Sequence, residues 1–409
     1  MRSRRRLATV TVLLALLLCA LPGFAATAAA APALPAGAEC PDGTAPGPPV
    51  DESEALRPGQ TEPPALPVPD PPVGGPAMGT CGDVVGEGTP AAPAVGVVSY
   101  VLADLDTGAV IAARNPHARL RPASLMKTLT GLLVARRLPM DETITGTQED
   151  ADQEGTRVGI GPGGQYTIRQ VFDSMLMASG NDAAHALAVR LTGSVPATVD
   201  LMNTTAHDLG ALDTRAATPS GLDGPGMSTS AYDLASIFRV AMREQAFAQA
   251  TSTTRIPFPG YGANPPFEVV NDNKLLTSGY QGYIGGKTGF TDDARHTFIG
   301  AAQRGGHRLV AVLMRGEQRP TPMYEQAAAL LDYGFALTDR RPAGTLTDAP
   351  AGGDDAQVSV TPEPGTGDSS DGGPASSSGA TSSSWGTPLL IVAIVAAAGG
   401  LVALRAARR

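Results

Sequence analysis

Only three of the chain's 30 basic residues are lysines, and two of these stand in short motifs that could carry chemistry. Lys127 ends the run Ser124-Leu125-Met126-Lys127, and Lys287 begins Lys287-Thr288-Gly289. Arginine cannot lose its proton in a protein, whereas a lysine taken out of water can. A lysine three residues after a serine therefore indicates a base beside a nucleophile. These residue types point to acyl-transfer chemistry.

The first motif is predicted to begin a helix. Leucines recur on one side of the segment 124–137, which favours a helix with one apolar face. Three-residue spacing on that helix puts Ser124 and Lys127 on the same face, within hydrogen-bonding reach. The free N–H groups of the helix start would lie where an oxyanion forms. By itself the pattern also fits an N-cap serine and a surface lysine.

The second motif, Ser179-Gly180-Asn181, follows the apolar stretch 171–177. Its hydroxyl could relay a proton, and its amide could hold a substrate carbonyl. The tripeptide is equally typical of a simple turn. Ser179-Gly180-Asn181 therefore indicates a catalytic site only in combination with the other two motifs.

The third motif is predicted to lie on a strand, where Lys287 and Gly289 point one way and Thr288 the other. Lys287 would supply positive charge and Thr288 a hydroxyl for a substrate carboxylate. Gly289 would let another backbone approach closely. A hairpin edge is the alternative interpretation of this motif taken alone.

In this order, the three motifs resemble the signature set of the penicillin-binding proteins and serine β-lactamases. More narrowly, the chain resembles the D-alanyl-D-alanine carboxypeptidases, whose further motifs match at 122–124, 177–184, 221–223 and 271–276. The resemblance covers about residues 95–338. It implies an α/β fold of the serine β-lactamase/DD-transpeptidase type, with an antiparallel sheet flanked by helices and a mostly helical subdomain.

The resemblance also implies roles for the motif residues. Ser124 would attack as nucleophile, with Lys127 as its neutral base, and Ser179 would pass the proton to the departing D-alanine. The residues expected to bind substrate are Asn181, Lys287, Thr288, Gly289 and Phe290. The backbone N–H groups of Ser124 and Phe290 would form the oxyanion site. The expected substrates are peptidoglycan stem pentapeptides and the expected inhibitors β-lactams, with no metal, cofactor or nucleic acid.

Two other functions stay open at this point. A class A β-lactamase needs a glutamate after the second motif, and residues 214–227 contain none. The second open function is that of an inactive protein that kept the fold and binds the cell wall. The five histidines are scattered and no Gly-x-Ser-x-Gly frames a serine, so neither a Ser–His–Asp site nor a metal site is predicted. Ala294-Arg295-His296 stands where the family often has Ala-Gly; Arg295, Arg315 and Arg319 are candidates for an additional carboxylate contact.

The ends of the chain indicate export and anchoring. Residues 1–32 have the basic head, apolar stretch and alanine-rich exit of a signal peptide. Residues 387–404 are apolar and uncharged, and the tail 405–409 carries three arginines. The positive-inside rule then predicts a single-pass protein of the cell membrane with its catalytic domain outside. In that oxidising compartment Cys40 and Cys81 are expected to form a disulfide.

Between the ends, composition separates three regions. Residues 33–92 are rich in Pro and Gly and are predicted to be an extended leader without a core of its own. Residues 93–341 form the catalytic domain, and 342–386 a disordered Gly/Ser/Asp linker. Within the domain, the predicted strands are 96–105, 109–113, 283–288, 296–302 and 308–314. Helices are predicted over about 165–250 and over 323–336.

Overall fold

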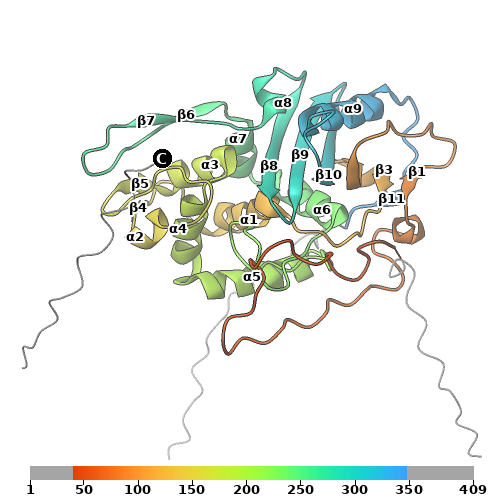
Figure 1. Ribbon diagram of the computed structural model, residues 1–409. Helices are drawn as coiled ribbons and strands as arrows, with labels where there is room; N and C mark the ends of the chain where they lie inside the picture. The colour runs from red at the N-terminus through yellow and green to blue at the C-terminus, as the bar shows by residue number, and fades with distance from the viewer. Residues whose placement is uncertain (1–39, 348–409) are drawn as a thin grey trace, which may run out of the picture. The chain divides into compact units, whose positions relative to one another are not determined.

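The computed structural model describes residues 40–347. Their central feature is a seven-stranded antiparallel sheet in the order β1-β3-β2-β10-β9-β8, with β11 beside β3 (Figure 1). Its strands are β1 (Asp83–Val85), β2 (Val97–Asp104), β3 (Ala109–Arg114), β8 (Tyr283–Thr291), β9 (Arg295–Arg304), β10 (His307–Gly316) and β11 (Gly344–Thr345). Because β2 pairs directly with β10, the sheet joins the two ends of the domain. The predicted fold class is confirmed.

The sheet separates two apolar layers. Successive residues of a strand face opposite sides, and β2 and β10 are buried on both. Val101 and Val312 face the large core under the helical subdomain. Leu102 and Leu313 face a smaller core covered by α9 (Met323–Ala336). Burial on both sides explains why these strands are nearly continuous apolar runs.

The helical part lies between β3 and β8 and covers one face of the sheet (Figure 1). Its helices are α1 (Lys127–Arg137), α2 (Gln148–Ala151), α3 (Ile168–Ala178), α4 (Asn181–Thr192), α5 (Val195–Asp208), α6 (Ala231–Ala241) and α7 (Gln245–Ser252). The short helix α8 (Lys274–Thr277) lies on the other face, where Leu275 belongs to the smaller core. The 3₁₀ helices are η1 (Pro76–Gly79) and η2 (Ala123–Met126). Two small hairpins, β4 (Thr143–Thr145) with β5 (Gln165–Thr167) and β6 (Arg255–Phe258) with β7 (Phe267–Val270), border the helices.

Most predicted elements occur within a few residues of their expected bounds. The final helix has the bounds predicted from its apolar pattern. The first predicted helix differs, because residues 123–126 form a 3₁₀ turn and the α-helix begins only at Lys127. Ala123 has a φ of 48°, so the chain enters this turn from a left-handed residue that an α-helix cannot include.

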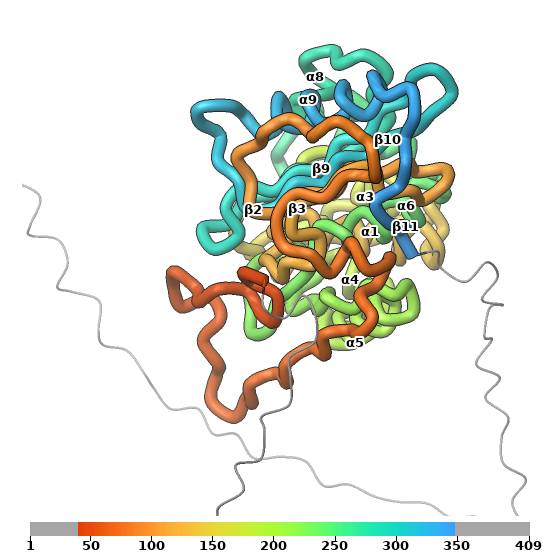
Figure 2. Tube along the Cα trace, turned by 90° about the vertical axis from the view of Figure 1, so that its right-hand side faces the viewer, coloured from red at the N-terminus to blue at the C-terminus, as the bar shows by residue number. Residues whose placement is uncertain are grey.

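The described part of the leader has little regular structure and is packed onto the domain. It runs beside α5 in both the ribbon and the tube view (Figures 1 and 2). Cys40 and Cys81 form the expected disulfide. Met78 is 1% exposed and belongs to the large core, so the leader contributes to the interior despite its composition. The structured region also extends past the expected limits of 93 and 341, because β1 and β11 pair with β3.

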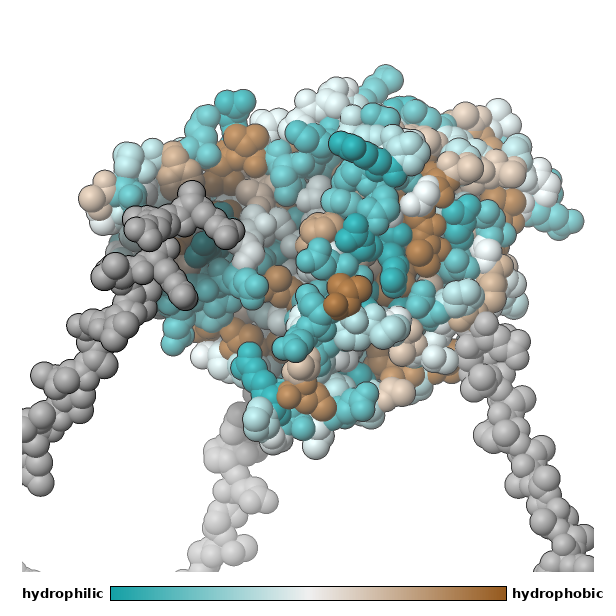
Figure 3. Space-filling model, in the orientation of Figure 1, coloured by the Kyte–Doolittle hydropathy of each residue, from teal (hydrophilic) through white to brown (hydrophobic). Residues whose placement is uncertain are grey.

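The predicted signal peptide, membrane helix and tail, and most of the linker, lie outside the described residues. Among residues 40–347, no helix has both the length and the apolar composition needed to cross a bilayer. On the face shown in Figure 3, apolar side chains form small separate groups among polar ones.

Candidate active site

Lys127 lies at the centre of the candidate site and is fully buried. Its amine nitrogen lies 2.9 Å from the Ser124 hydroxyl oxygen, 2.7 Å from Asn181 Oδ1 and 2.7 Å from the carbonyl oxygen of Ser220. The 3₁₀ turn helps to make the first contact, because side chains at i and i+3 eclipse one another in that conformation. The contact expected between Ser124 and Lys127 is therefore present.

The partners of Lys127 match a neutral amine. A neutral lysine has two N–H donors and one lone pair. The Ser220 carbonyl can only accept a hydrogen bond, and the Asn181 oxygen is oriented by the donation of Asn181 Nδ2 to the Glu154 carbonyl at 2.7 Å. These two oxygens take both N–H groups. The lone pair is left for the Ser124 hydroxyl, which is the arrangement a general base needs.

The electrostatic surroundings favour the same state. Burial lowers the pKa of Lys127 well below its ordinary value, and the nearby Lys287 lowers it further, whereas Asp272 and Asp182 act in the opposite direction. Desolvation disfavours the charged form of a lysine. Burial and Lys287 thus favour the uncharged form of Lys127.

Glycines allow the backbone to close around Ser124. A Cβ on Gly289 would lie 2.9 Å from the Ser124 backbone nitrogen, and a Cβ on Gly221 only 1.8 Å from the Ala123 carbonyl oxygen. Strand β8 therefore passes directly beside the N–H group of Ser124, as the sequence predicted for Gly289. Ser124 itself is half-buried. A substrate carbonyl could reach the hydroxyl and this N–H together.

The second motif occupies the junction of α3 and α4. Ser179 ends α3 in a left-handed conformation with a φ of 62°, and Asn181 is the first residue of α4. Asn181 donates its backbone N–H to Thr156 at 2.7 Å. Ser179 is 6% exposed, and within residues 40–347 its hydroxyl makes no hydrogen bond. The structure thus places Asn181 in contact with Lys127, but shows no such contact for Ser179.

The third motif lies on β8 with its lysine buried. The Lys287 ammonium donates to the Thr288 carbonyl at 2.8 Å, and Lys287 is 1% exposed. Burial lowers its pKa, and the charge of Asp272 opposes this effect. The Thr288 hydroxyl donates to Asp272 Oδ1 at 2.9 Å. A substrate carboxylate would therefore have to compete with Asp272 for the hydroxyl that the sequence assigned to it.

Sequence reasoning missed several groups around the motifs. The Ser220 carbonyl could not be predicted from the sequence, because it is a backbone group of a loop and any residue type would supply it. Asp182 is fully buried and accepts N–H groups of Val158, Gly159 and Ile160, which fixes the loop beside Asn181. A charged residue directly after Ser-Gly-Asn could have marked it.

The other predicted candidates lie around the rim or away from the site. Phe290 is 48% exposed, and the Arg295 guanidinium lies 5.6 Å from its ring centre while pairing with Glu317 at 2.8 Å. Among the described residues, no histidine ring nitrogen hydrogen-bonds a serine hydroxyl. His117 and His185 instead contact the carboxylates of Asp213 and Asp150 at 2.7 and 2.6 Å.

Comparison with known proteins decides the family. A family model described as D-alanyl-D-alanine carboxypeptidase, Peptidase S11, matches residues 87–318. The D-alanyl-D-alanine carboxypeptidase DacB2 of Mycobacterium tuberculosis is 45% identical over 253 residues, which cover 61% of this chain and 85% of that protein. The chain belongs to the D-alanyl-D-alanine carboxypeptidase family.

Other members and solved structures agree on the family and the fold. DacF of Bacillus subtilis is 30% identical over 249 residues, which cover 60% of this chain and 63% of that protein. A crystal structure of a D-alanyl-D-alanine carboxypeptidase from Mycobacterium tuberculosis has a TM-score of 0.61 and 42% identity over 64% of this chain and all of that one. A Streptomyces DD-transpeptidase has a TM-score of 0.57 and 26% identity over 61% of this chain and all of that one.

Membership makes this chain a serine-type D-alanyl-D-alanine carboxypeptidase with a penicillin-binding-protein fold. The three motifs all lie inside the matched residues. The leader lies almost wholly before residue 87, so it is outside the part that defines the family.

Proposed function

We propose that the chain removes the terminal D-alanine from peptidoglycan stem pentapeptides through an acyl-enzyme on Ser124. The observation that carries the proposal is the contact of Lys127 with the Ser124 hydroxyl, in surroundings that favour a neutral amine. Membership of the D-alanyl-D-alanine carboxypeptidase family supplies the substrate class.

In the acylation step, Lys127 takes the hydroxyl proton while Ser124 Oγ bonds to the carbonyl carbon between the two D-alanines. The bond from that carbon to the D-alanine nitrogen then breaks, and the leaving amine takes up a proton through Ser179. The N–H groups of Ser124 and Phe290 would stabilise the oxyanion, each by roughly 3 kcal/mol. Lys287 and Thr288 would hold the terminal carboxylate, with Asn181 keeping Lys127 in place. Water then releases the acyl group from Ser124.

Release of D-alanine from a defined pentapeptide tests the proposal. Wild-type chain should release it, and Ser124→Ala should not, while both unfold at the same temperature. A fluorescent penicillin should label only the chain that retains Ser124. Absence of both reactions in the folded wild-type chain would favour the inactive wall-binding alternative.

One assay distinguishes a β-lactamase from the proposed carboxypeptidase. No glutamate occurs in the loop 214–227, where a class A enzyme would need one for deacylation. We therefore expect a chromogenic cephalosporin to acylate Ser124 and remain bound. Continuous hydrolysis at ordinary enzymatic rates would contradict this expectation.

We also propose that the catalytic domain lies outside the cell, held by a C-terminal membrane helix over 387–404. The signal-like residues 1–32 and the arginines after the apolar segment support this orientation. The Cys40–Cys81 disulfide suits an oxidising compartment. Protease added to intact spheroplasts should remove the domain; full protection would contradict the proposal.

A further inference from the structure

Three basic residues just before the catalytic motif all face the leader. His117 lies in a turn, and from Ala118 to Arg121 the side chains alternate between the core and the leader. Ala118 and Leu120 are buried in the core, whereas His117, Arg119 and Arg121 reach the leader. The backbone pairing of Leu120 with Thr229 holds the other side of this segment. The segment lies between the leader and the core and ends three residues before Ser124.

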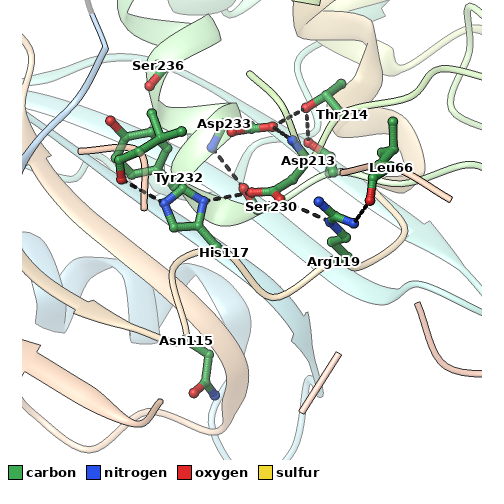
Figure 4. A network of polar contacts seen from close by, with 12 residues as sticks. Leu66, Asn115, His117, Arg119, Asp213, Thr214, Ser230, Tyr232, Asp233 and Ser236 are labelled. Atoms are coloured by element: carbon green, nitrogen blue, oxygen red, sulfur yellow. Dashed lines mark hydrogen bonds and ion pairs between the residues drawn. The ribbon is translucent and has the colours of Figure 1, made fainter. Parts of the chain in front are cut away.

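Arg119 makes the densest set of contacts and is 1% exposed. Its guanidinium donates to the carbonyl oxygens of Thr44, Leu66 and Pro67 at 2.8, 2.7 and 2.6 Å, and to Asp213 Oδ1 at 3.0 Å. Figure 4 shows Leu66 beside Arg119, and Asp213 between Arg119 and His117. Without the leader, three hydrogen bonds of a buried cation would be lost.

His117 and Arg121 extend the attachment in both directions. His117 Nε2 lies 2.9 Å from the Val73 carbonyl oxygen. Arg121 is 4% exposed, pairs with Glu54 through two nitrogens and donates to the Gly47 carbonyl at 2.9 Å. Most of these donors bind backbone carbonyl oxygens of the leader, and within its described part the Glu54 carboxylate is the one side chain that accepts from them. A Pro-rich segment can make these contacts, because proline keeps its backbone carbonyl oxygen.

The same leader stretch also contacts the turn that follows β8. The Asp293 carboxylate accepts the Val50 N–H and the Ser53 hydroxyl, the latter at 3.1 Å. Asp293 stands four residues after Gly289, whose backbone lies against Ser124. Residues 47–54 thus connect both sides of the site: the segment leading into Ser124 and the strand carrying Lys287.

The conformation beside Ser124 needs such support. Ala123 has a φ of 48°, a left-handed conformation that costs free energy for any residue other than glycine. It persists only where neighbouring groups fix it. Arg121 comes two residues earlier, and the Pro122 carbonyl accepts the Thr297 hydroxyl at 2.9 Å.

We propose that the part of the leader before the family match, described over residues 40–86, is a positioning element that holds Ser124 against strand β8 during acylation. The proposal rests on the proposed function and extends it to a segment outside the residues that match the family. The leader acts through Arg121 and Asp293 and does not touch the reacting atoms. Displacing a nucleophile by about 1 Å can slow a reaction by up to about a hundredfold.

The test uses the full chain and the fluorescent penicillin. Glu54→Gln removes the charged partner of Arg121, Glu54→Asp keeps the charge, and Asp83→Asn breaks another leader–domain ion pair, with Arg114, that does not touch residues 117–121. We expect Glu54→Gln to lower the first-order acylation rate constant about tenfold or more at saturating penicillin. The penicillin Kd should change less than about twofold, Glu54→Asp should recover most of the rate, and Asp83→Asn should retain it.

The outcomes separate the two proposals. A wild-type chain that takes no label overturns the proposed function. Labelling of folded Glu54→Gln at the wild-type rate overturns the role of the leader alone. Should Glu54→Gln unfold, the wild-type chain is measured again after dithiothreitol opens the Cys40–Cys81 ring; a similar loss of rate in the folded chain supports the inference, and an unchanged rate overturns it.

Discussion

The amide oxygen of Asn181 lies 2.7 Å from the amine nitrogen of Lys127. The contact matters because it occupies one of only two N–H groups that a neutral lysine has. With the Ser220 carbonyl taking the other, the lone pair faces Ser124. Asn181 of the second motif therefore helps to determine where the N–H groups and the lone pair of Lys127 point.

Replacing this oxygen by a charged one should disable the base. Asn181→Asp puts a carboxylate beside Lys127, which raises the pKa of the amine because a neighbouring negative charge favours its protonated form. We expect the acylation rate at pH 7 to fall by roughly two orders of magnitude, with the rate recovering as pH rises. Acylation followed from pH 6 to 10 measures this. An unshifted pH profile would show that Asn181 does not control Lys127.

The chain's own scarcity of lysine supplies a matched pair of variants. Lys127→Arg keeps a cation but removes a group that can deprotonate, so acylation should fall by about a thousandfold. Lys274→Arg makes the same change at an exposed position at the start of α8 and should leave the rate unchanged. Stopped-flow labelling compares the two. Equal rates in both variants would exclude Lys127 as the base.

Asp182 should matter for stability through the backbone that it binds. Its carboxylate accepts the N–H groups of Val158, Gly159 and Ile160 at 2.8–3.0 Å. Asp182→Asn turns one acceptor oxygen into a donor that faces these N–H groups. The free energy of unfolding should drop by about 2–3 kcal/mol in a urea titration. Asp208→Asn, at an exposed site, should change the free energy of unfolding little. If Asp182→Asn changed it as little as Asp208→Asn does, the role of Asp182 would be contradicted.

Acid should weaken the network around Asp213. Burial alone would raise the pKa of Asp213, but its hydrogen bond to His117 and the charges of His117 and Arg119 bring it below the usual value. A depressed carboxyl pKa contributes stability above the unfolded value of about 3.9, which is lost as pH falls through the folded pKa. Asp213→Asn should therefore lower the Tm clearly at pH 7, and the difference from wild type should narrow below pH 4. A difference independent of pH would show that the charge of Asp213 contributes nothing.

The sequence predicted the elements better than the contacts between them. Alternation and apolar periodicity located the sheet strands and α9, because those patterns depend on local geometry. The 3₁₀ turn at Ser124 was missed, and the segments that pack against it at Gly221 and Gly289 are distant in the sequence. The Ser220 carbonyl and the Thr288–Asp272 bond likewise follow only from the assembled fold.

The leader also shows that composition predicts local structure but not the contacts made in the assembled fold. Its Pro-rich sequence predicts an extended chain without a core of its own, and the described residues lie on the domain with a short 3₁₀ helix and strand near the end of the leader. Its attachment depends on backbone oxygens, which leave no trace in the sequence of the leader. The signal lay elsewhere, in the alternation of His117, Arg119 and Arg121 with the apolar residues of the same segment.

The most direct test of a neutral Lys127 is the pH dependence of acylation by penicillin in the wild-type chain. Burial and Lys287 should bring the controlling pKa well below that of an ordinary lysine, about 10.4. The rate constant should then reach its plateau near neutral pH and stay level from pH 8 to 9. A rate that keeps rising tenfold per pH unit up to pH 10 would mean that Lys127 is charged at pH 7.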